Sequence, residues 1–100
     1  MDTTVLGRTG MKISRLGIGL AEIGVQNEVS DVGHLLNSAL DSGINFLDTS
    51  ACYGISEELI GRTVAHRRNE YYLATKCGHV IDPDTGRVIS SSESWTAKTI

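Results

Sequence analysis

Short apolar runs alternate with amphipathic helical stretches along most of this sequence, and this alternation limits the folds that the chain can adopt. Runs of strand type cover residues 15–19, 44–48 and 70–76. Stretches with helical periodicity stand between them, at residues 28–42 and 56–67. Strands that alternate with helices pair in parallel through right-handed crossovers. The sequence therefore predicts an α/β fold with a parallel sheet.

The two helical stretches carry their own start and stop signals. The first places apolar residues at i, i+3, i+4, i+7 and i+8 on one face: Val32, Leu35, Leu36, Ala39 and Leu40. Asn27 is the expected cap of this helix and Gly43 its expected stop. Ser56 is the expected cap of the second helix, because two acidic residues follow it in the first turn.

Three further segments complete the predicted order. Residues 3–13 predict a β-hairpin, because strand-like triplets flank the turn-forming group GRTG. Residues 82–86 (DPDTG) predict a turn, and the serine-rich run 90–94 leads into the expected first turns of a third helix at 95–100. The order is hairpin, strand, helix, strand, helix, strand and the start of a helix.

Composition excludes several classes of protein. The chain is 40% hydrophobic and 21% charged, as soluble globular domains are. Its net charge of -3 with scattered Lys and Arg offers no basic patch, so we expect neither a nucleic acid nor a membrane as partner. No apolar run reaches the roughly 18 residues of a membrane span, and the start lacks the features of a signal peptide, so we expect a cytoplasmic protein. Cys52 and Cys77 lack metal or redox spacing and are expected to be reduced.

Polar residues at the ends of two neighbouring predicted strands form the candidate site. Asp48 ends the second strand, Tyr53 follows in its loop, and Lys76 ends the third strand. Functional groups gather at the carboxyl ends of parallel strands, and neighbouring strands are about 4.8 Å apart, so the lysine can reach both other residues. A free tyrosine has a pKa near 10, and a close ammonium stabilises the phenolate, which favours general acid and base work. The expected role of Asp48 is to hold the lysine charged and oriented.

These residues stand in motifs that resemble the aldo-keto reductase family. Residues 43–61 (GINFLDTSACYGISEELIG) and 73–77 (LATKC) resemble its signature region. The LGRTG hairpin, the LGIG strand and the SWT helix start extend the resemblance over nearly the whole chain. The Asn-Phe pair and the YGISE spacing are more similar to the microbial and channel-subunit-like branch than to the aldose-reductase branch.

The resemblance implies a fold and a reaction. The fold is the N-terminal part of a (β/α)8 TIM barrel with an N-terminal β-hairpin, and the reaction is NADPH-dependent reduction of an aldehyde or ketone. By resemblance, Tyr53 is the proton donor, Lys76 makes the phenol more acidic, and Asp48 pairs with Lys76. Gly19, Leu20 and Asp48 are implied to lie near the nicotinamide ribose of NADPH.

The chain departs from the family pattern in two places. The family's catalytic histidine stands at the end of the next strand, whereas His79 belongs to the loop after Lys76. Residues 20–22 (LAE) stand where many members place a hydroxyl residue and an aromatic. A barrel of this type needs about 250 residues. We therefore expect residues 1–100 to be the N-terminal fragment of one barrel domain, inactive alone, whose specific substrate and oligomeric state the sequence leaves open.

Two of these segments also match motifs of other dehydrogenase classes. The segment from Tyr72 to Lys76 matches the Y-x-x-x-K of short-chain dehydrogenases, which requires a helix, because strand positions four apart are separated by about 13 Å. The GIG at 17–19 fits only the start of a dinucleotide fingerprint. A non-catalytic nicotinamide-binding regulatory subunit and a small α/β interaction module remain alternatives.

Overall fold

The computed structural model describes residues 1–26, 28–82, 84 and 88–93. The elements are, in chain order, β1 (Thr3–Val5), β2 (Lys12–Ser14), β3 (Ile18–Gly19), α1 (Ile23–Gln26), α2 (Val29–Asp41), β4 (Phe46–Asp48), α3 (Ser56–Val64), the 3-10 helix η1 (Ala65–Glu70), β5 (Tyr72–Ala74), β6 (His79–Ile81) and β7 (Val88–Glu93).

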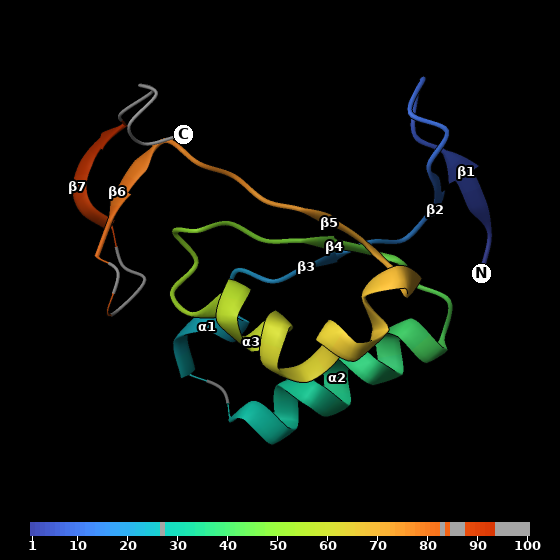
Figure 1. Ribbon diagram of the computed structural model, residues 1–100, viewed down its shortest axis with the longest axis horizontal. Helices are drawn as coiled ribbons and strands as arrows, with labels where there is room; N and C mark the ends of the chain where they lie inside the picture. Colours follow the sequence, from blue (N-terminus) through green and yellow to red (C-terminus); the bar gives the residue numbers. More distant parts are fainter. Residues whose placement is uncertain (27, 83, 85–87, 94–100) are drawn as a thin grey trace.

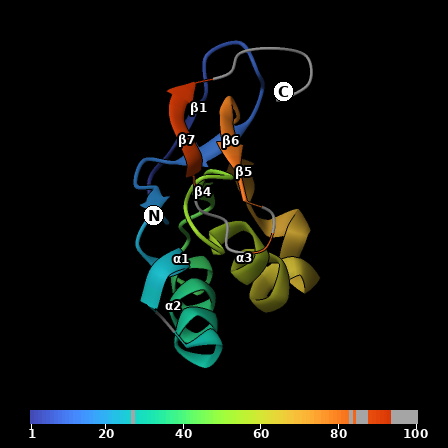
Figure 2. The same cartoon turned by 90° about the vertical axis from the view of Figure 1, so that its left-hand side faces the viewer.

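A parallel sheet with the strand order β3-β4-β5 forms the centre of the chain. This sheet confirms the α/β prediction. Figure 1 shows α1, α2 and α3 on one side of the strands, and Figure 2 shows the same separation end on. The predicted hairpin is also confirmed, since β1 pairs antiparallel with β2, and it lies at the amino ends of the sheet strands.

The core lies between the sheet and the helices. Leu36 of α2, Leu47 of β4 and Leu59 of α3 are all fully buried in it. Four of the five predicted core positions of α2 are buried, at Val32, Leu36, Ala39 and Leu40. Leu35 was expected there as well, but 46% of its surface is exposed. Its exposure shows that the buried stripe of α2 is narrower than the sequence pattern predicts.

The ends of the helices agree with the sequence in part. Gly43 has φ of +94°, which glycine adopts readily, so the predicted stop after α2 is confirmed. The cap of α2 is Glu28, and the predicted cap Asn27 lies outside the described residues. The prediction that Ser56 caps α3 was wrong, because Ile55 occupies the cap position and Ser56 is buried within the helix.

Three local features differ from the prediction. The four-residue helix α1 was not predicted, because it is too short to show a helical period. The predicted second helix ends as α-helix at Val64 and continues as η1. The strand β7 was not predicted; it includes residues 90–93 of the serine-rich run and pairs antiparallel with β6. The predicted helix at 95–100, and most of the turn at 82–86, lie outside the described residues.

Arg67 ties η1 to the end of α2. Its guanidinium donates two hydrogen bonds to the Glu70 carboxylate, at 2.9 and 2.8 Å, and one to Asp41 Oδ1 at 2.9 Å. A further bond of 2.9 Å reaches Asn37 Oδ1. The hydrogen bonds with Glu70, followed by those with Asp41, raise the pKa of Arg67, and the bond from Arg67 lowers the pKa of Glu70. Because η1 leads into β5, this cluster helps to fix the strand that precedes Lys76.

We predict that Arg67→Gln lowers the urea midpoint of the 100-residue chain, because glutamine cannot bridge Asn37, Asp41 and Glu70 together. Arg62→Gln, at an exposed position of α3, is the matched control. Because the pKa of Glu70 is lowered in the folded chain, its pairing with Arg67 stabilises the fold above the ordinary carboxyl pKa. This stabilisation is lost as the pH falls through the pKa that Glu70 has in the folded chain. The difference between the urea midpoints of the two variants should therefore become smaller in acid. Equal midpoints for both variants at neutral pH would contradict this prediction.

Candidate active site

The register of the parallel strands places the predicted catalytic residues at one end of the sheet. Asp48 ends β4 and lies opposite Gly19 of β3 and Ala74 of β5. The pairing continues past the strand ends, since Thr49 N donates to the Ala74 carbonyl at 2.8 Å. Lys76, two residues after β5, is thereby placed beside the start of the loop that follows β4.

Lys76 is bound to this loop by two hydrogen bonds. Its Nζ donates to Asp48 Oδ1 at 2.8 Å and to the Thr49 carbonyl oxygen at 2.8 Å. The side chains of Lys76 and Asp48 are 49% and 48% exposed, so the pair is half open to solvent. The hydrogen bond to Asp48 is the largest cause of the raised pKa of Lys76, with a smaller contribution from Tyr53, and desolvation opposes both.

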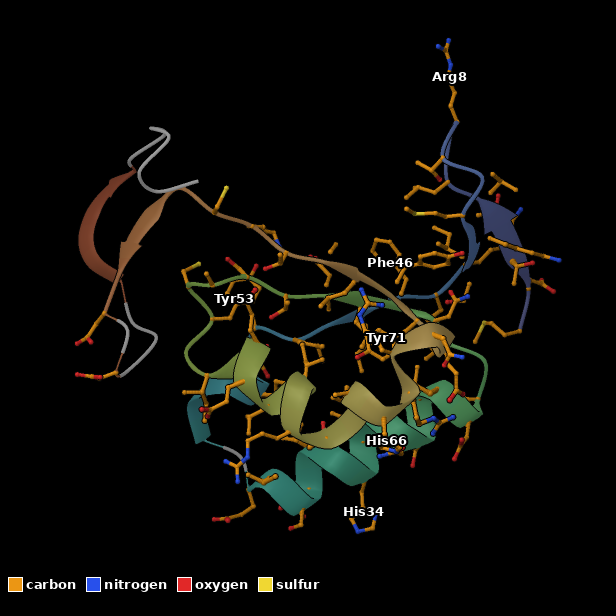
Figure 3. The ribbon with its side chains drawn as sticks, in the orientation of Figure 1. Arg8, His34, Phe46, Tyr53, His66 and Tyr71 are labelled. Carbon is orange, nitrogen blue, oxygen red and sulfur yellow. The ribbon has the colours of Figure 1, made fainter. Side chains whose placement is uncertain are left out.

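Tyr53 lies next to the same ammonium. Lys76 Nζ is 5.0 Å from the centroid of the Tyr53 ring, within the range of a cation–π interaction. Figure 3 shows Tyr53 in the loop between β4 and α3, at the carboxyl end of the sheet. The structure therefore brings Asp48, Tyr53 and Lys76 together, with the lysine ammonium in contact with both other residues.

A buried hydroxyl pair lies beneath the Tyr53 loop. Thr49 Oγ1 and Ser56 Oγ are 2.7 Å apart, and both residues are fully buried. The bond joins the first residue of the loop to the first residue of α3. Sequence reasoning missed it because Ser56 has the residue type of a helix cap, and only the fold brings it against Thr49.

The predicted cofactor-binding residues lie beside Asp48. Gly19 is opposite Asp48 in the register, and no atom lies within 4 Å of the place a Cβ would take there, so the space above it is open. Leu20 is fully buried, and its N–H donates to the Asp48 carbonyl at 2.9 Å. Any contact of Leu20 with a cofactor would therefore involve its backbone.

Two further polar contacts adjoin the site. Thr75, the neighbour of Lys76, donates from Oγ1 to Glu57 Oε2 at 2.6 Å, which joins the end of β5 to the first turn of α3. Ser50 Oγ and Cys52 Sγ are 3.1 Å apart in the Tyr53 loop. The sequence predicted neither contact, because Glu57 has the type of an ordinary first-turn acid and Ser50 that of an ordinary loop residue.

The described part of the chain also has a concave site. A pocket of about 330 Å³ lies at the opposite end of the strands, lined among others by Lys12, Asn45 and Tyr72. It is remote from Lys76 and Tyr53, so residue chemistry, not concavity, defines the candidate site. Within the described residues, no cluster of His, Cys, Asp and Glu could hold a metal ion. None of the helices described is long and apolar enough to cross a membrane.

Comparison with protein families gives a match over most of the chain. The model of the aldo/keto reductase family matches residues 15–99. The uncharacterized oxidoreductase YrpG of Bacillus subtilis is 38% identical over 96 residues, covering 86% of this chain and 29% of the relative. A rice protein described as a probable voltage-gated potassium channel subunit beta is 35% identical over 77 residues, covering 71% of this chain and 24% of its own length.

Solved structures agree with the sequence match. A putative aldo-keto reductase from Pseudomonas aeruginosa superposes with a TM-score of 0.77 at 28% identity, covering 94% of this chain and 35% of that structure. An aldo-keto reductase from Bacillus halodurans, solved in its holo form, gives 0.75 at 27% identity, covering 95% and 30%. The chain has the fold of the N-terminal part of a TIM barrel, and it spans about a third or less of each of these proteins.

The buried hydroxyl pair generates a prediction on stability. Thr49→Val or Ser56→Ala alone leaves one buried hydroxyl without its partner, so each should lower the free energy of unfolding by about 1–3 kcal/mol. The double variant should lose less than the sum of the two, because no unpaired hydroxyl remains. Urea unfolding of the 100-residue chain measures the cycle. Strictly additive losses would show that the two hydroxyls do not interact.

The ion pair generates a prediction on titration. Because Asp48 raises the pKa of Lys76, Asp48→Asn should lower the pH at which Lys76 loses its proton. The pair stabilises the fold below the ordinary lysine pKa, and this contribution is lost as the pH rises through the folded-state value. The side-chain NMR shift of the Lys76 ε-carbon follows the titration. Asp41→Asn is the matched control and should leave the midpoint of Lys76 in place; the same midpoint in Asp48→Asn would contradict the prediction.

Proposed function

Because the chain belongs to the aldo/keto reductase family, we propose that it carries the proton-donating site of an NADPH-dependent enzyme that reduces an aldehyde or ketone to an alcohol. The family match supports the oxidoreductase class. The observation that carries the proposed site is the position of the Lys76 ammonium, 2.8 Å from the Asp48 carboxylate and 5.0 Å from the centre of the Tyr53 ring.

In the proposed mechanism, Tyr53 donates its phenolic proton to the carbonyl oxygen of the substrate. The developing phenolate is negative, and the neighbouring Lys76 ammonium stabilises it electrostatically. Asp48 and the Thr49 carbonyl hold the ammonium in place with two hydrogen bonds, so it need not reorganise during the transfer. In the reverse direction, the same phenolate accepts a proton from an alcohol.

Bound NADPH would supply the hydride in this proposal. The open space above Gly19 and the half-exposed Asp48 carboxylate beside it leave room for the nicotinamide ribose. Leu20 would contribute backbone atoms to the same place, because its side chain is in the core. The choice of NADPH over NADH rests on the family resemblance.

We propose further that residues 1–100 are the N-terminal fragment of one barrel domain and do not reduce carbonyl compounds alone. The catalytic histidine implied by the resemblance has no counterpart among these residues. The proposed partner is a small carbonyl compound, with neither nucleic acid nor membrane as partner, and the proposed location is the cytoplasm. NADPH oxidation with an aldehyde by the purified 100-residue chain, lost in Tyr53→Phe, would overturn the inactive part of this proposal.

A chimera tests the proposed reaction. Residues 1–100 would replace the matched segment of the Bacillus halodurans reductase, which covers 30% of that chain. We predict that the chimera oxidises NADPH with an aldehyde, and that Tyr53→Phe lowers kcat by about 10²–10⁴-fold while NADPH still quenches protein fluorescence. Tyr72→Phe, a half-buried tyrosine of β5, is the matched control and should keep its activity. Full activity of the Tyr53→Phe chimera would contradict the proposal.

A non-catalytic regulatory subunit is the second candidate function. It is favoured by the 35% identity to the rice protein described as a probable potassium channel subunit beta. In that case the fold binds the cofactor, and contacts with a partner carry the function. A partner complex that survives Tyr53→Phe, together with no turnover in the chimera, would support this candidate over the enzyme.

A further inference from the structure

Two glycines from separate elements pack backbone against backbone next to Tyr53. Gly24 lies in α1, and Gly54 follows Tyr53 in its loop. A Cβ on Gly24 would overlap the Tyr53 carbonyl oxygen and lie 2.9 Å from Ser56 N. A Cβ on Gly54 would overlap the Gly24 carbonyl oxygen. Real Cβ atoms do not tolerate such distances to backbone atoms, so both positions require glycine at this separation.

A hydrogen bond strengthens the same contact. Ile55 N donates to the Gly24 carbonyl oxygen at 3.2 Å. Gly54 has φ of +58°, which turns the chain after Tyr53 and lets the next N–H point at α1. The loop after Tyr53 is therefore joined to α1 by close packing and by a hydrogen bond at once.

The helix α1 provides a firm support for this contact. Leu20, just before α1, is fully buried, and Ile23, its first residue, is 7% exposed. Both belong to the main hydrophobic core, so α1 cannot move without disturbing that core. The bonds Tyr53 N to Ser50 O and Ser56 N to Tyr53 O join residues three apart, so they shape the loop without fixing it to another element.

We propose that Gly24 is a positioning residue for Tyr53: the close contact of α1 with Gly54 sets how near the Tyr53 ring lies to the Lys76 ammonium. The segment from Gly19 to Gly24 connects two parts of the site within a few residues. Gly19 lies opposite Asp48, and the chain reaches Gly24 five positions later, against Tyr53. A side chain at Gly24 pushes the Tyr53 carbonyl away from α1 and carries the phenol with it. The catalytic consequence of this displacement rests on the proposed function, and the geometric one does not.

The geometric test uses the 100-residue chain and one matched control. Gly61 is also helical, in α3, and nothing lies within 4 Å of the place its Cβ would take. The readout is the NOE between the ε-methylene of Lys76 and the ring of Tyr53. We expect this NOE in the unsubstituted chain and in Gly61→Ala, and its loss in Gly24→Ala. Its absence from the unsubstituted chain, its retention in Gly24→Ala, or its loss in both variants overturns the proposal.

The catalytic test uses the chimera and separates the two proposals. Gly24→Ala should lower kcat by about 10²-fold, the effect of a displacement near 1 Å, with little change in the KM for NADPH. Gly61→Ala should leave both constants unchanged. If Tyr53→Phe keeps full activity, the proposed function fails, whatever Gly24→Ala does. If Tyr53→Phe loses activity and Gly24→Ala keeps it, the positioning role fails and the proposed function stands.

A measurement without any substitution covers the case in which Gly24→Ala does not fold. Urea is added to the unsubstituted chain, and the NOE between the α-protons of Gly24 and Gly54 is followed beside the Tyr53 to Lys76 NOE. Simultaneous loss of both signals, while the core signals of α2 remain, supports the positioning role. Survival of the Tyr53 to Lys76 signal after the glycine contact has opened overturns it.

Discussion

Parallel pairing between β4 and β5 fixes the geometry on which the candidate site depends. The pairing sets Asp48 opposite Ala74 and continues through the bond from Thr49 N to the Ala74 carbonyl. A shift of one residue would turn Asp48 to the other face of the sheet. The buried Leu47 between the sheet and the helices opposes such a shift, because it would have to leave the core. Hydrophobic burial thus sets the register, and the register sets the position of Lys76.

Much of this arrangement was predictable from the sequence, because it follows from local patterns. Strand-type runs and an apolar helical stripe gave the order of elements around the sheet, and strand ends carrying Asp48 and Lys76 gave the site. The four residues of α1 show no periodicity, and Ser56 has the residue type of a cap although its hydroxyl serves the buried pair with Thr49. The contact between Gly24 and Gly54 left no pattern at all, since it joins two residues without side chains that are 30 positions apart.

The surface of the described chain has the form expected of part of a barrel. Among the described residues, β3 and β5 each pair along one edge, with β4. Most of the large exposed apolar side chains lie in or next to the hairpin: Met1, Val5, Leu6, Met11 and Leu16. In a closed parallel barrel, each strand pairs on both edges and the sheet is covered on its faces. The hairpin and the open strand edges are the parts of this chain that such closure would protect from solvent.

The Lys76 ammonium and the Tyr53 phenol are the two groups of the site that carry a proton to give. The ordinary lysine pKa already lies above the neutral range, and the hydrogen bond to Asp48 raises the pKa of Lys76 further, so its ammonium stays charged there. The half-exposed pair with Asp48 adds little to stability, because solvent screens such pairs. Its value lies in orientation, since the bonds to Asp48 and to the Thr49 carbonyl hold Nζ over the Tyr53 ring. In the proposed mechanism, this fixed cation lies beside the phenolate that remains once Tyr53 has given up its proton.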